Sequence, residues 1–357
     1  MLKALKPLDW KKVLKFDSGE ILGLDIGSFA VKLIQVKKSK AGNSITAAHI
    51  AEIEEAQLKE EAAVQMNTVK AIHECINTLK LNTKMAVCGV SGPEVAIRNF
   101  RFPQLSPDEI DSAVLLEAEQ VCPLNVDSSS IDYQIMHEDE DNLEGVLVAA
   151  TNRIVKNKQM MVGSASLNNV LMDVDGLALL NCFSECHSDD SSKVCAVLNV
   201  GNSYTNLAII DDHGMPFIRD ITNAGSNIIS SMAKLLGQTP EQVKKQLFDS
   251  PDNGGDSERF RTVLEQACQE LIRDVNGTLR YYNTRENSTK IEEVYLCGGF
   301  SLAQDFVEIL NSHLSVDVLL WNPFEQIPFR VNPDCERILK EKGPAFALAA
   351  GLAMRSF

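Results

Sequence analysis

The sequence lacks an apolar run long enough to cross a lipid bilayer. Its longest one, AFALAAGLAM over residues 345–354, is about half of the roughly 20 residues that a membrane-spanning helix needs. The start of the chain also lacks the apolar stretch and cleavage site of a signal peptide, because Trp10, Lys11 and Lys12 stand where that stretch would lie. We therefore expect a chain that neither spans a membrane nor carries a secretion signal.

The chain is also poor in positive charge. It has 34 Lys and Arg residues against 49 Asp and Glu residues, which gives a formal net charge of −15 at pH 7. General nucleic-acid binding needs a basic face that displaces counterions from phosphate. The composition therefore excludes a general nucleic-acid-binding protein.

Paired cysteine motifs are absent as well. The nine cysteines are an odd number and include no C-x-x-C pair. We interpret them as buried, reduced thiols of a cytoplasmic protein. Cys182, Cys186 and His187 do cluster, but no fourth ligand follows at a suitable spacing, so the pattern does not favour a zinc site.

The length favours two domains or one duplicated architecture, because 357 residues are many for a single core. Residues 1–17 form a lysine-rich tail with five lysines and interleaved leucines. Such a tail can lie on an anionic membrane surface. The alternative is a solvated tail, which Pro7 favours because it limits any helix to a few turns.

One sequence motif occurs twice, at positions about half the chain length apart. LDIGSFAVKLIQV begins at Leu24 and LNVGNSYTNLAII begins at Leu198, and they align without a gap at an offset of 199 − 25 = 174 residues. Each reads as an apolar strand, a polar-x-Gly-polar turn and a second strand. Strand and helix patterns follow in a similar order in both halves, which indicates an internal duplication.

The patterns predict a division of the chain into units. Short apolar strands, a helix over about 60–79 and the strand MAVCGV form the first lobe. A helix beginning at Ser106-Pro107, two strands (SSIDYQI and GVLVAAT) and a helix over about 153–166 form an inserted α+β unit. The expected ranges are the tail 1–17, the first lobe 18–91 and 170–190, the inserted subdomain 92–169, and the second lobe 191–357.

The repeated turn suits phosphate binding. Glycine lets the backbone approach a ligand, so that successive N–H groups can point at one anion. Ser28 adds a hydroxyl donor, and Asp25 offers a carboxylate to the water shell of Mg²⁺. A single D-x-G is commonly only a hairpin turn. Two copies in matching register favour a site that holds a polyphosphate between them.

A third glycine-containing segment also favours nucleotide binding. VYLCGGFS, residues 294–301, is an apolar strand that runs into Gly298-Gly299 and then a helix. The glycine backbone and the helix N-terminus can face the ribose, phosphate or base of a nucleotide.

These three segments resemble the two phosphate motifs and the adenosine motif of the actin, Hsp70 and sugar-kinase superfold. LEAEQVCPLNVDSSSIDYQI, LMDVDGLALL, NPFEQI and the closing ALAAGLAMR are similar to segments of one branch, the PilM family of type IV pilus assembly. The resemblance extends from Ile21 to near the end of the chain and leaves out the first seventeen or so residues.

The resemblance implies an α/β fold of duplicated, actin-like (ribonuclease-H-like) architecture, with two lobes around a nucleotide cleft and an inserted subdomain as in FtsA. It implies ATP and Mg²⁺ as cofactors, and as partner the short cytoplasmic N-terminal peptide of a PilN-like inner-membrane protein. Pilus motor ATPases are a further partner class. The expected place is the cytoplasm, at the inner face of the inner membrane, in a type IV pilus platform or a related type II secretion platform.

Carried over residue by residue, the resemblance assigns a nucleotide-binding set in which Asp25 also serves the metal. The set comprises Asp25, Gly27, Ser28, Lys32, Asn199, Gly201, Asn202, Ser203, Thr205, Asn206, Gly225, Ser226, Gly298, Gly299 and Phe300.

One position departs from the family pattern. The second turn normally reads D-x-G, and here Asn199 replaces the carboxylate. An amide cannot supply the charge that steadies Mg²⁺ and orients a water. We therefore expect ATP binding with slow or absent hydrolysis, and no catalytic residue is assigned.

Two alternatives stay open. One is an active small-molecule kinase or ATPase of the same superfold, against which the sequence offers no carboxylate for a substrate hydroxyl. The other is an FtsA-like filament-forming protein of cell division. FtsA-like proteins end in an amphipathic membrane helix, whereas this sequence ends just after a helix of small residues.

Overall fold

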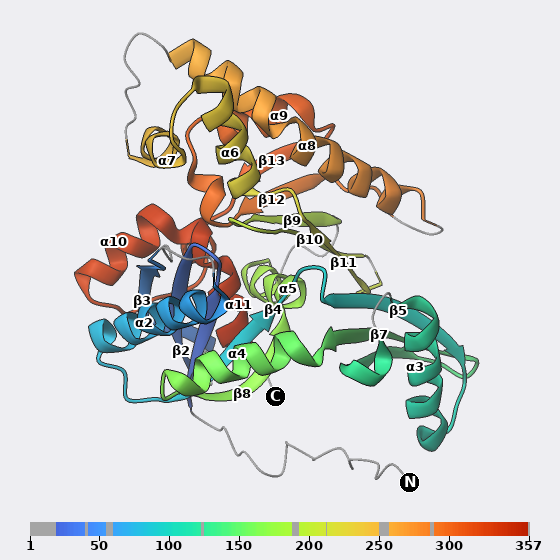
Figure 1. The fold of residues 1–357 in the computed structure, drawn as a ribbon. Coiled ribbons are helices and arrows are strands. Elements are labelled where there is room, and N and C mark those ends of the chain that lie inside the picture. The colour runs from blue at the N-terminus through green and yellow to red at the C-terminus, as the bar shows by residue number, and fades with distance from the viewer. Residues whose placement is uncertain are drawn as a thin grey trace.

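The structure is a computed structural model that describes residues 19–39, 42–54, 60–122, 125–187, 193–211, 213–249, 257–285 and 289–355. The lysine-rich tail 1–17 and its two interpretations lie outside these ranges. The chain forms two lobes, one above the other in Figure 1, and a smaller three-stranded unit extends beside the lower lobe. Within the described ranges, no helix is both long enough and apolar enough to cross a bilayer.

The first lobe is built on a five-stranded sheet of order β3-β2-β1-β4-β8. The three strands β1, β2 and β3 are antiparallel, and β1, β4 and β8 run parallel to one another. The strands are β1 (Glu20–Ile26), β2 (Ala30–Ser39), β3 (Gly42–Glu52), β4 (Met85–Val90) and β8 (Asn168–Val174).

The second lobe repeats this sheet. Its order is β11-β10-β9-β12-β13, again with three antiparallel strands and then parallel pairing of β9, β12 and β13. The strands are β9 (Cys195–Val200), β10 (Thr205–Ile210), β11 (Pro216–Ile221), β12 (Glu293–Cys297) and β13 (Asp317–Leu320). The duplicated α/β architecture predicted from the sequence is therefore present at the level of sheet topology.

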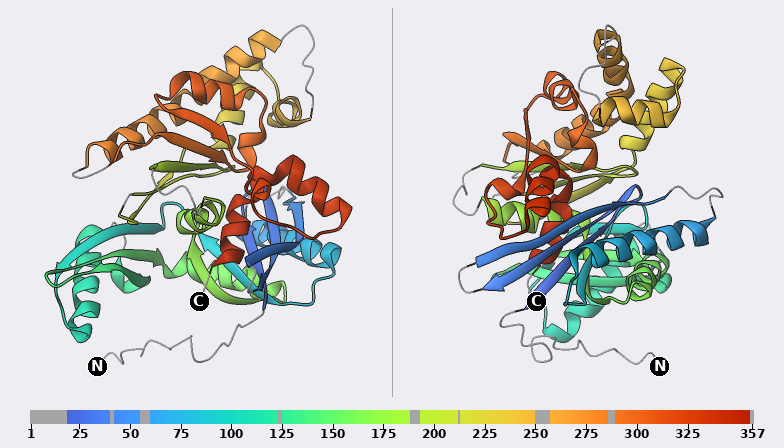
Figure 2. Two further views of the ribbon diagram at one scale, coloured as in Figure 1. Left: turned by 180° about the vertical axis from the view of Figure 1, so that it is seen from behind. Right: turned by 90° about the vertical axis from the view of Figure 1, so that its left-hand side faces the viewer.

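Helices cover both faces of the first sheet. Helices α2 (Glu61–Leu79) and α4 (Asn152–Ser164) pack on one face, and α5 (Asp175–Cys186) and α11 (Ala347–Met354) pack on the other. The core under α5 and α11 continues into the second lobe, where it includes Val197, Cys297 and Trp321. An apolar core thus joins the two lobes, whose ribbons Figure 2 shows from two further sides.

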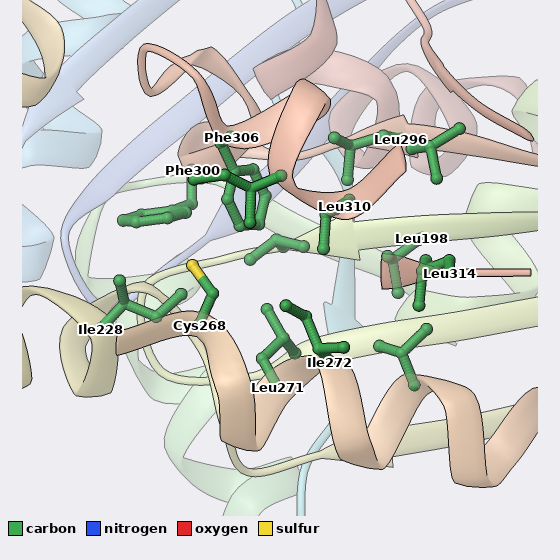
Figure 3. Close-up of a cluster of buried hydrophobic side chains, with 14 of the residues drawn as sticks. Leu198, Ile228, Cys268, Leu271, Ile272, Leu296, Phe300, Phe306, Leu310 and Leu314 are labelled. Carbon is green, nitrogen blue, oxygen red and sulfur yellow. The ribbon is translucent and has the colours of Figure 1, made fainter. Parts of the chain in front are cut away.

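The second lobe has its own core. Helices α6 (Gly225–Leu236), α7 (Pro240–Phe248), α8 (Ser257–Asn283) and α9 (Phe306–His313) contribute to it. Figure 3 shows Phe300 and Phe306 side by side in this cluster, with Cys268 and Leu271 reaching it from α8. All of these side chains are buried.

The three-stranded unit has the order β5-β7-β6 and carries one helix. Its elements are β5 (Val95–Pro103), α3 (Pro107–Val121), β6 (Ser129–Glu138) and β7 (Asn142–Thr151). A capping box begins α3, in which Ser106 N and Oγ both donate to Glu109 Oε2. The sequence analysis predicted the helix and two of the strands but not β5.

The packing differs from the expected range 92–169 at its C-terminal end. Helix α4 was expected to close the inserted unit, yet Val162, Ala165 and Leu167 lie in the core of the first lobe. Strand β8 begins at Asn168 and pairs with β4. The reason is that the apolar positions of α4 face α2 and the first sheet, so the helix returns the chain to the first lobe.

Three further elements differ from the expected pattern. The helix expected over about 302–313 is divided into a 3₁₀ turn (Gly299–Leu302) and α9, since Asp305 has a left-handed φ of 63°. Helix α10 (Pro333–Lys342) was not expected, although Asn332 caps it and Pro333 begins it. The closing helix expected from Pro344 begins with a 3₁₀ turn before α11.

Candidate functional site

The two repeated turns meet each other. The β1–β2 turn comes from the first lobe and the β9–β10 turn from the second. Ser28 Oγ lies 2.6 Å from Ser203 Oγ, and Asn202 Nδ2 donates a hydrogen bond to Ser28 Oγ at 3.0 Å. The three side chains, predicted to serve one site, are therefore brought together from opposite lobes.

The two turns also share their geometry. A Cβ added to Gly27 would stand 2.9 Å from the carbonyl oxygen of Ala30, and one added to Gly201 would stand 2.8 Å from that of Tyr204. These contacts are equivalent under the offset of the repeat. In the second turn the Gly201 N–H donates to Tyr204 O at 3.0 Å. Each turn closes so tightly that a side chain at the glycine would displace the backbone.

A polar pair lies beneath each turn at matching positions. Below the first turn, Lys32 Nζ donates to Asp25 Oδ2 at 2.8 Å, and both side chains are mostly buried. Below the second, Asn199 Nδ2 donates to Asn206 Oδ1, also at 2.8 Å. Both pairs are directly opposed in their strands. The second half thus carries an uncharged copy of the ion pair in the first.

The uncharged pair is hydrogen-bonded to a half-buried carboxylate, Asp220, which the sequence analysis missed. Asn206 Nδ2 donates to Asp220 Oδ1 at 2.7 Å, and the Gly92 N–H donates to Asp220 Oδ2 at 2.5 Å. Burial raises the pKa of Asp220, while the hydrogen bonds from Gly92 and Asn206 act in the opposite direction.

A second buried carboxylate lies at the start of α5. Burial raises the pKa of Asp175 to about 7, against the opposing effects of nearby Lys158 and of a hydrogen bond from Ser91 Oγ at 2.6 Å. Lys158 Nζ also donates to the carbonyl oxygen of Ile26 beside the first turn, at 2.9 Å. The available signal was the D-V-D-G phrase at a strand end, where an acidic residue opens a helix.

The start of α6 bonds the second turn directly. The Gly225 N–H donates to Gly201 O at 3.0 Å, and the Ser226 N–H donates to Asn202 O at 2.8 Å. These bonds place Gly225 and Ser226, two of the residues in the expected nucleotide-binding set, beside the second turn. Two backbone N–H groups at the start of α6 thus donate hydrogen bonds to carbonyl groups of the β9–β10 turn.

The Gly298-Gly299 segment reaches the same place. Gly298 has a φ of 94°, and a Cβ there would stand 2.5 Å from Asn199 Oδ1. Only glycine fits both conditions. Phe300 is 4% exposed, and its ring centroid lies 4.9 Å from that of Phe306 (Figure 3). Its ring therefore packs in the core, so only its backbone can face a ligand.

Thr205 and Asn206 face the protein interior. Thr205 is fully buried and its Oγ1 donates to Asn223 O at 2.8 Å. Asn206 is 2% exposed and bonds its strand neighbours as described above. The structure therefore places these two predicted residues beneath the turn and not between the two turns.

Another contact joins the lobes beside the first turn. Lys244 Nζ of α7 lies 5.1 Å from the centroid of the Phe29 ring, within the range of a cation–π interaction. Phe29 follows Ser28 directly, so the first turn touches the second lobe at two places. The sequence analysis missed this pair, because spacing gives no signal for a contact between residues so far apart.

The donors at the turns suit a hydrated metal better than a bare one. Within the described ranges, no group of three or more His, Cys, Asp or Glu side chains is placed to hold an ion. Magnesium usually keeps several waters and is held through one or two carboxylates and the phosphates of a substrate. Asp25, beneath the first turn, fits such an indirect role.

Two surface hollows lie away from the turns. One, of about 340 Å³, is lined by residues of α10. The other, of about 240 Å³, lies between α6 and α8. Neither is lined by a residue of the two turns.

Comparisons with known proteins agree with this arrangement. A model of the family described as "Type IV pilus assembly protein PilM" matches residues 23–357. The chain is similar to a solved "PilM-PilN type IV pilus biogenesis complex", with a TM-score of 0.80 and 24% identity over 94% of this chain and 98% of that chain.

More distant structures share the fold. The ethanolamine utilization protein EutJ from Carboxydothermus hydrogenoformans has a TM-score of 0.55 at 12% identity, over 95% of this chain and 90% of that chain. A diol dehydratase-reactivating factor in nucleotide-free form has a TM-score of 0.55 at 10% identity, over 93% and 98%. The predicted duplicated, actin-like fold is confirmed by these likenesses and by the paired sheets.

Proposed function

The chain belongs to the PilM family of type IV pilus assembly proteins, and from this premise we propose that it is an ATP-binding adaptor of the pilus platform. ATP with magnesium would bind between the two lobes, and a PilN-like inner-membrane protein would be the partner. The observation that carries the nucleotide part is the contact of the two repeated turns through Ser28 and Ser203.

A triphosphate between the turns takes the place of the direct bonds between them. Ser28 and Ser203 lie too close together to admit a phosphate group, so the turns separate when the ligand enters. The backbone N–H groups of both glycine turns and the serine hydroxyls then donate to phosphate oxygens. Lys32 pairs with Asp25, so the ion pair beneath the first turn brings no net negative charge next to the phosphates.

Magnesium supplies charge neutralisation to the phosphates when it is bound. In this proposal Asp25 holds a water of the metal shell and remains oriented by Lys32. Gly298 and Gly225 bring backbone next to the second turn, where the nucleoside would lie. Phe300 supports this surface from the core and does not itself touch the base.

Hydrolysis is expected to be slow. The uncharged Asn199 is engaged with Asn206 and is in no position to act as a base for an attacking water. The purified protein should therefore bind ATP with little release of phosphate. Rapid release that disappears in Asp25→Ala would contradict this part of the proposal.

The partner is proposed from the family and from one solved complex. That structure is titled as a complex of PilM with PilN, and we propose that the short cytoplasmic N-terminal peptide of a PilN-like protein binds this chain. Binding to such a peptide would hold the chain at the inner face of the inner membrane. Pilus motor ATPases are a further proposed partner class.

A binding assay separates this proposal from its rivals. A labelled synthetic peptide copying the N-terminus of the PilN-like protein of the same organism is titrated with the full chain, with and without ATP and magnesium. Tighter binding with ATP supports the adaptor. Turnover of a sugar or other small substrate without peptide binding would indicate a kinase, and ATP-dependent filaments would indicate an FtsA-like protein.

A further inference from the structure

A row of polar side chains crosses the second sheet from the second turn. Asn199, Asn206 and Asp220 are directly opposed on β9, β10 and β11. They are joined by hydrogen bonds of 2.8 and 2.7 Å. Asn199 is 9% exposed, Asn206 is 2% exposed and Asp220 is half-buried, so water does not readily replace a bond lost between the two amides.

The row ends at the root of the three-stranded unit. Asp220 Oδ2 accepts a hydrogen bond from the Gly92 N–H. Gly92 lies between β4 of the first lobe and β5, where the chain leaves the lobe. A carboxylate of the second lobe therefore holds the backbone at the point where the three-stranded unit begins.

A second contact reaches the same glycine. A Cβ on Gly92 would stand 3.0 Å from two ring atoms of Tyr204, and Gly92 has a φ of 94°. Tyr204 belongs to the second turn, because its carbonyl oxygen accepts the Gly201 N–H that closes this turn. The second turn thus touches Gly92 both through the polar row and through a ring.

Beyond Gly92, further contacts join the two strand ends at the root of the three-stranded unit, where the chain enters and leaves this unit. Thr151 N, at the end of β7, donates to Glu94 O at 3.0 Å, and Arg153 pairs with the Glu94 carboxylate at 2.6 Å. A displacement of Gly92 therefore moves the first residue of β5 and the last residue of β7 together. These two strand ends are the covalent connections of the unit to the rest of the chain.

We infer that Asp220 is a positioning residue that couples nucleotide binding between the turns to the placement of the three-stranded unit. When a triphosphate separates the turns, the second turn moves relative to the first lobe. Gly92 follows through Asp220 and Tyr204, because an unpaired buried carboxylate or amide would cost more than the movement of a loop. The inference rests on the proposed nucleotide site and adds the residues by which that site would regulate the unit.

Hydrogen exchange on the full chain tests this coupling. Exchange is followed with and without ATP and magnesium in peptides that cover the two turns and in a peptide that covers 92–103. In the unmodified chain we expect ATP to change exchange at the turns, and to change it at 92–103 by about 5-fold or more, the usual lower range of coupling between sites. The Asp220→Asn variant should keep the change at the turns and lose most of it at 92–103.

Asp173→Asn is the matched control. Asp173, on β8, is a buried aspartate that accepts a backbone N–H, from Val174, and burial also raises its pKa, but its ion-pair partner is Arg355, which follows α11. This variant should behave like the unmodified chain. Should Asp220→Asn fail to fold, Tyr204→Leu removes the other contact to Gly92 without altering a buried charge, and should weaken the change at 92–103.

The outcomes separate the two proposals. No change at the turns in the unmodified chain would overturn the nucleotide site and the inference with it. A change at the turns without one at 92–103 would overturn the inference alone. An equal change at 92–103 in the Asp220→Asn and unmodified chains would also overturn it.

Discussion

At the scale of single residues, the two halves of the chain carry a polar pair at equivalent, directly opposed strand positions. The pair is charged in the first half and neutral in the second. Asp25 and Lys32 form an ion pair, and Asn199 and Asn206 form a hydrogen bond of the same length. The same backbone environment therefore accepts a charged and a neutral pair. A buried charge that loses its partner is costly, whereas a neutral replacement of both partners often is not.

This duplication predicts the behaviour of two variants. Lys32→Asn leaves Asp25 mostly buried without its partner, and should lower the free energy of unfolding by about 3–5 kcal/mol. Adding Asp25→Asn recreates the pair of the second half and should recover most of the loss. Denaturant unfolding of both variants measures this, and a double variant no more stable than Lys32→Asn would contradict the equivalence of the pairs.

Asp175 predicts a dependence of stability on pH. Its pKa is raised from 3.8 to about 7 in the folded state, so the folded chain holds a proton that the unfolded chain releases. The contribution of Asp175 to stability is therefore largest below its unfolded pKa, and it declines as the pH rises towards about 7.

Asp175→Asn should flatten this decline, because the amide does not titrate. Denaturant unfolding at several pH values between 3.8 and about 7 measures the slope. Asp220 and Asp173 are shifted in the same direction, so part of the slope remains in the variant. Slopes that are equal in the two proteins would show that Asp175 is not protonated in the folded state.

The residues that the sequence analysis missed share one physical property. Asp175 and Lys158 reach the site from α5 and α4, which lie outside both turn hairpins, and Asp220 reaches it from β11, the strand that follows the second hairpin. The turns themselves were predictable because strand, glycine and polar residue are adjacent in the chain. Long-range partners depend on how the sheets pack, and a single sequence holds no local signal for that.

At the scale of elements, α11 fits between α5 and β1 through glycines. A Cβ on Gly351 would stand 1.8 Å from Ala178 O of α5, and one on Gly23 would stand 1.9 Å from Ala349 O of α11. Both contacts involve backbone atoms, which cannot rotate away. The core that joins the two lobes thus depends on close helix approach and not only on apolar composition.

Two glycine substitutions separate packing from helix propensity. Gly351→Ala should lower the free energy of unfolding by about 1–3 kcal/mol, since backbone must move to admit the methyl group. Gly277→Ala in α8 is the matched control, because a Cβ there meets nothing within 4 Å. This control should gain about 0.5–1 kcal/mol from the better helix former. Equal effects in chemical denaturation would refute the close packing of α5 and α11.

Element prediction from sequence succeeded where patterns are long and capped. Helix α3 was found from its Ser-Pro start, and α2 from the helical pattern over about 60–79. Strand β5 was missed because the exposed residues Arg98 and Arg101 interrupt its apolar run. Helix α4 was found, but its assignment to the inserted unit differed from the packing, because the apolar side of a helix does not identify its partner.

At the scale of the whole molecule, duplication explains why one chain has two lobes with matching sheets. In each sheet the first hairpin closes at a glycine turn. The common core under α5 and α11 holds the two lobes so that these turns face each other. The three-stranded unit departs from β4 at Gly92, next to the second turn. The fold therefore brings the proposed ligand site and the root of the three-stranded unit into contact.

Calorimetric titration of the full chain with ATP and magnesium tests the central claim most directly, namely that both turns bind one triphosphate. We predict one nucleotide per chain, and a loss of affinity of about 10-fold or more on either Gly27→Ala or Gly201→Ala, because each methyl group displaces the backbone of its turn. Binding that persists unchanged when either turn is altered would contradict the claim.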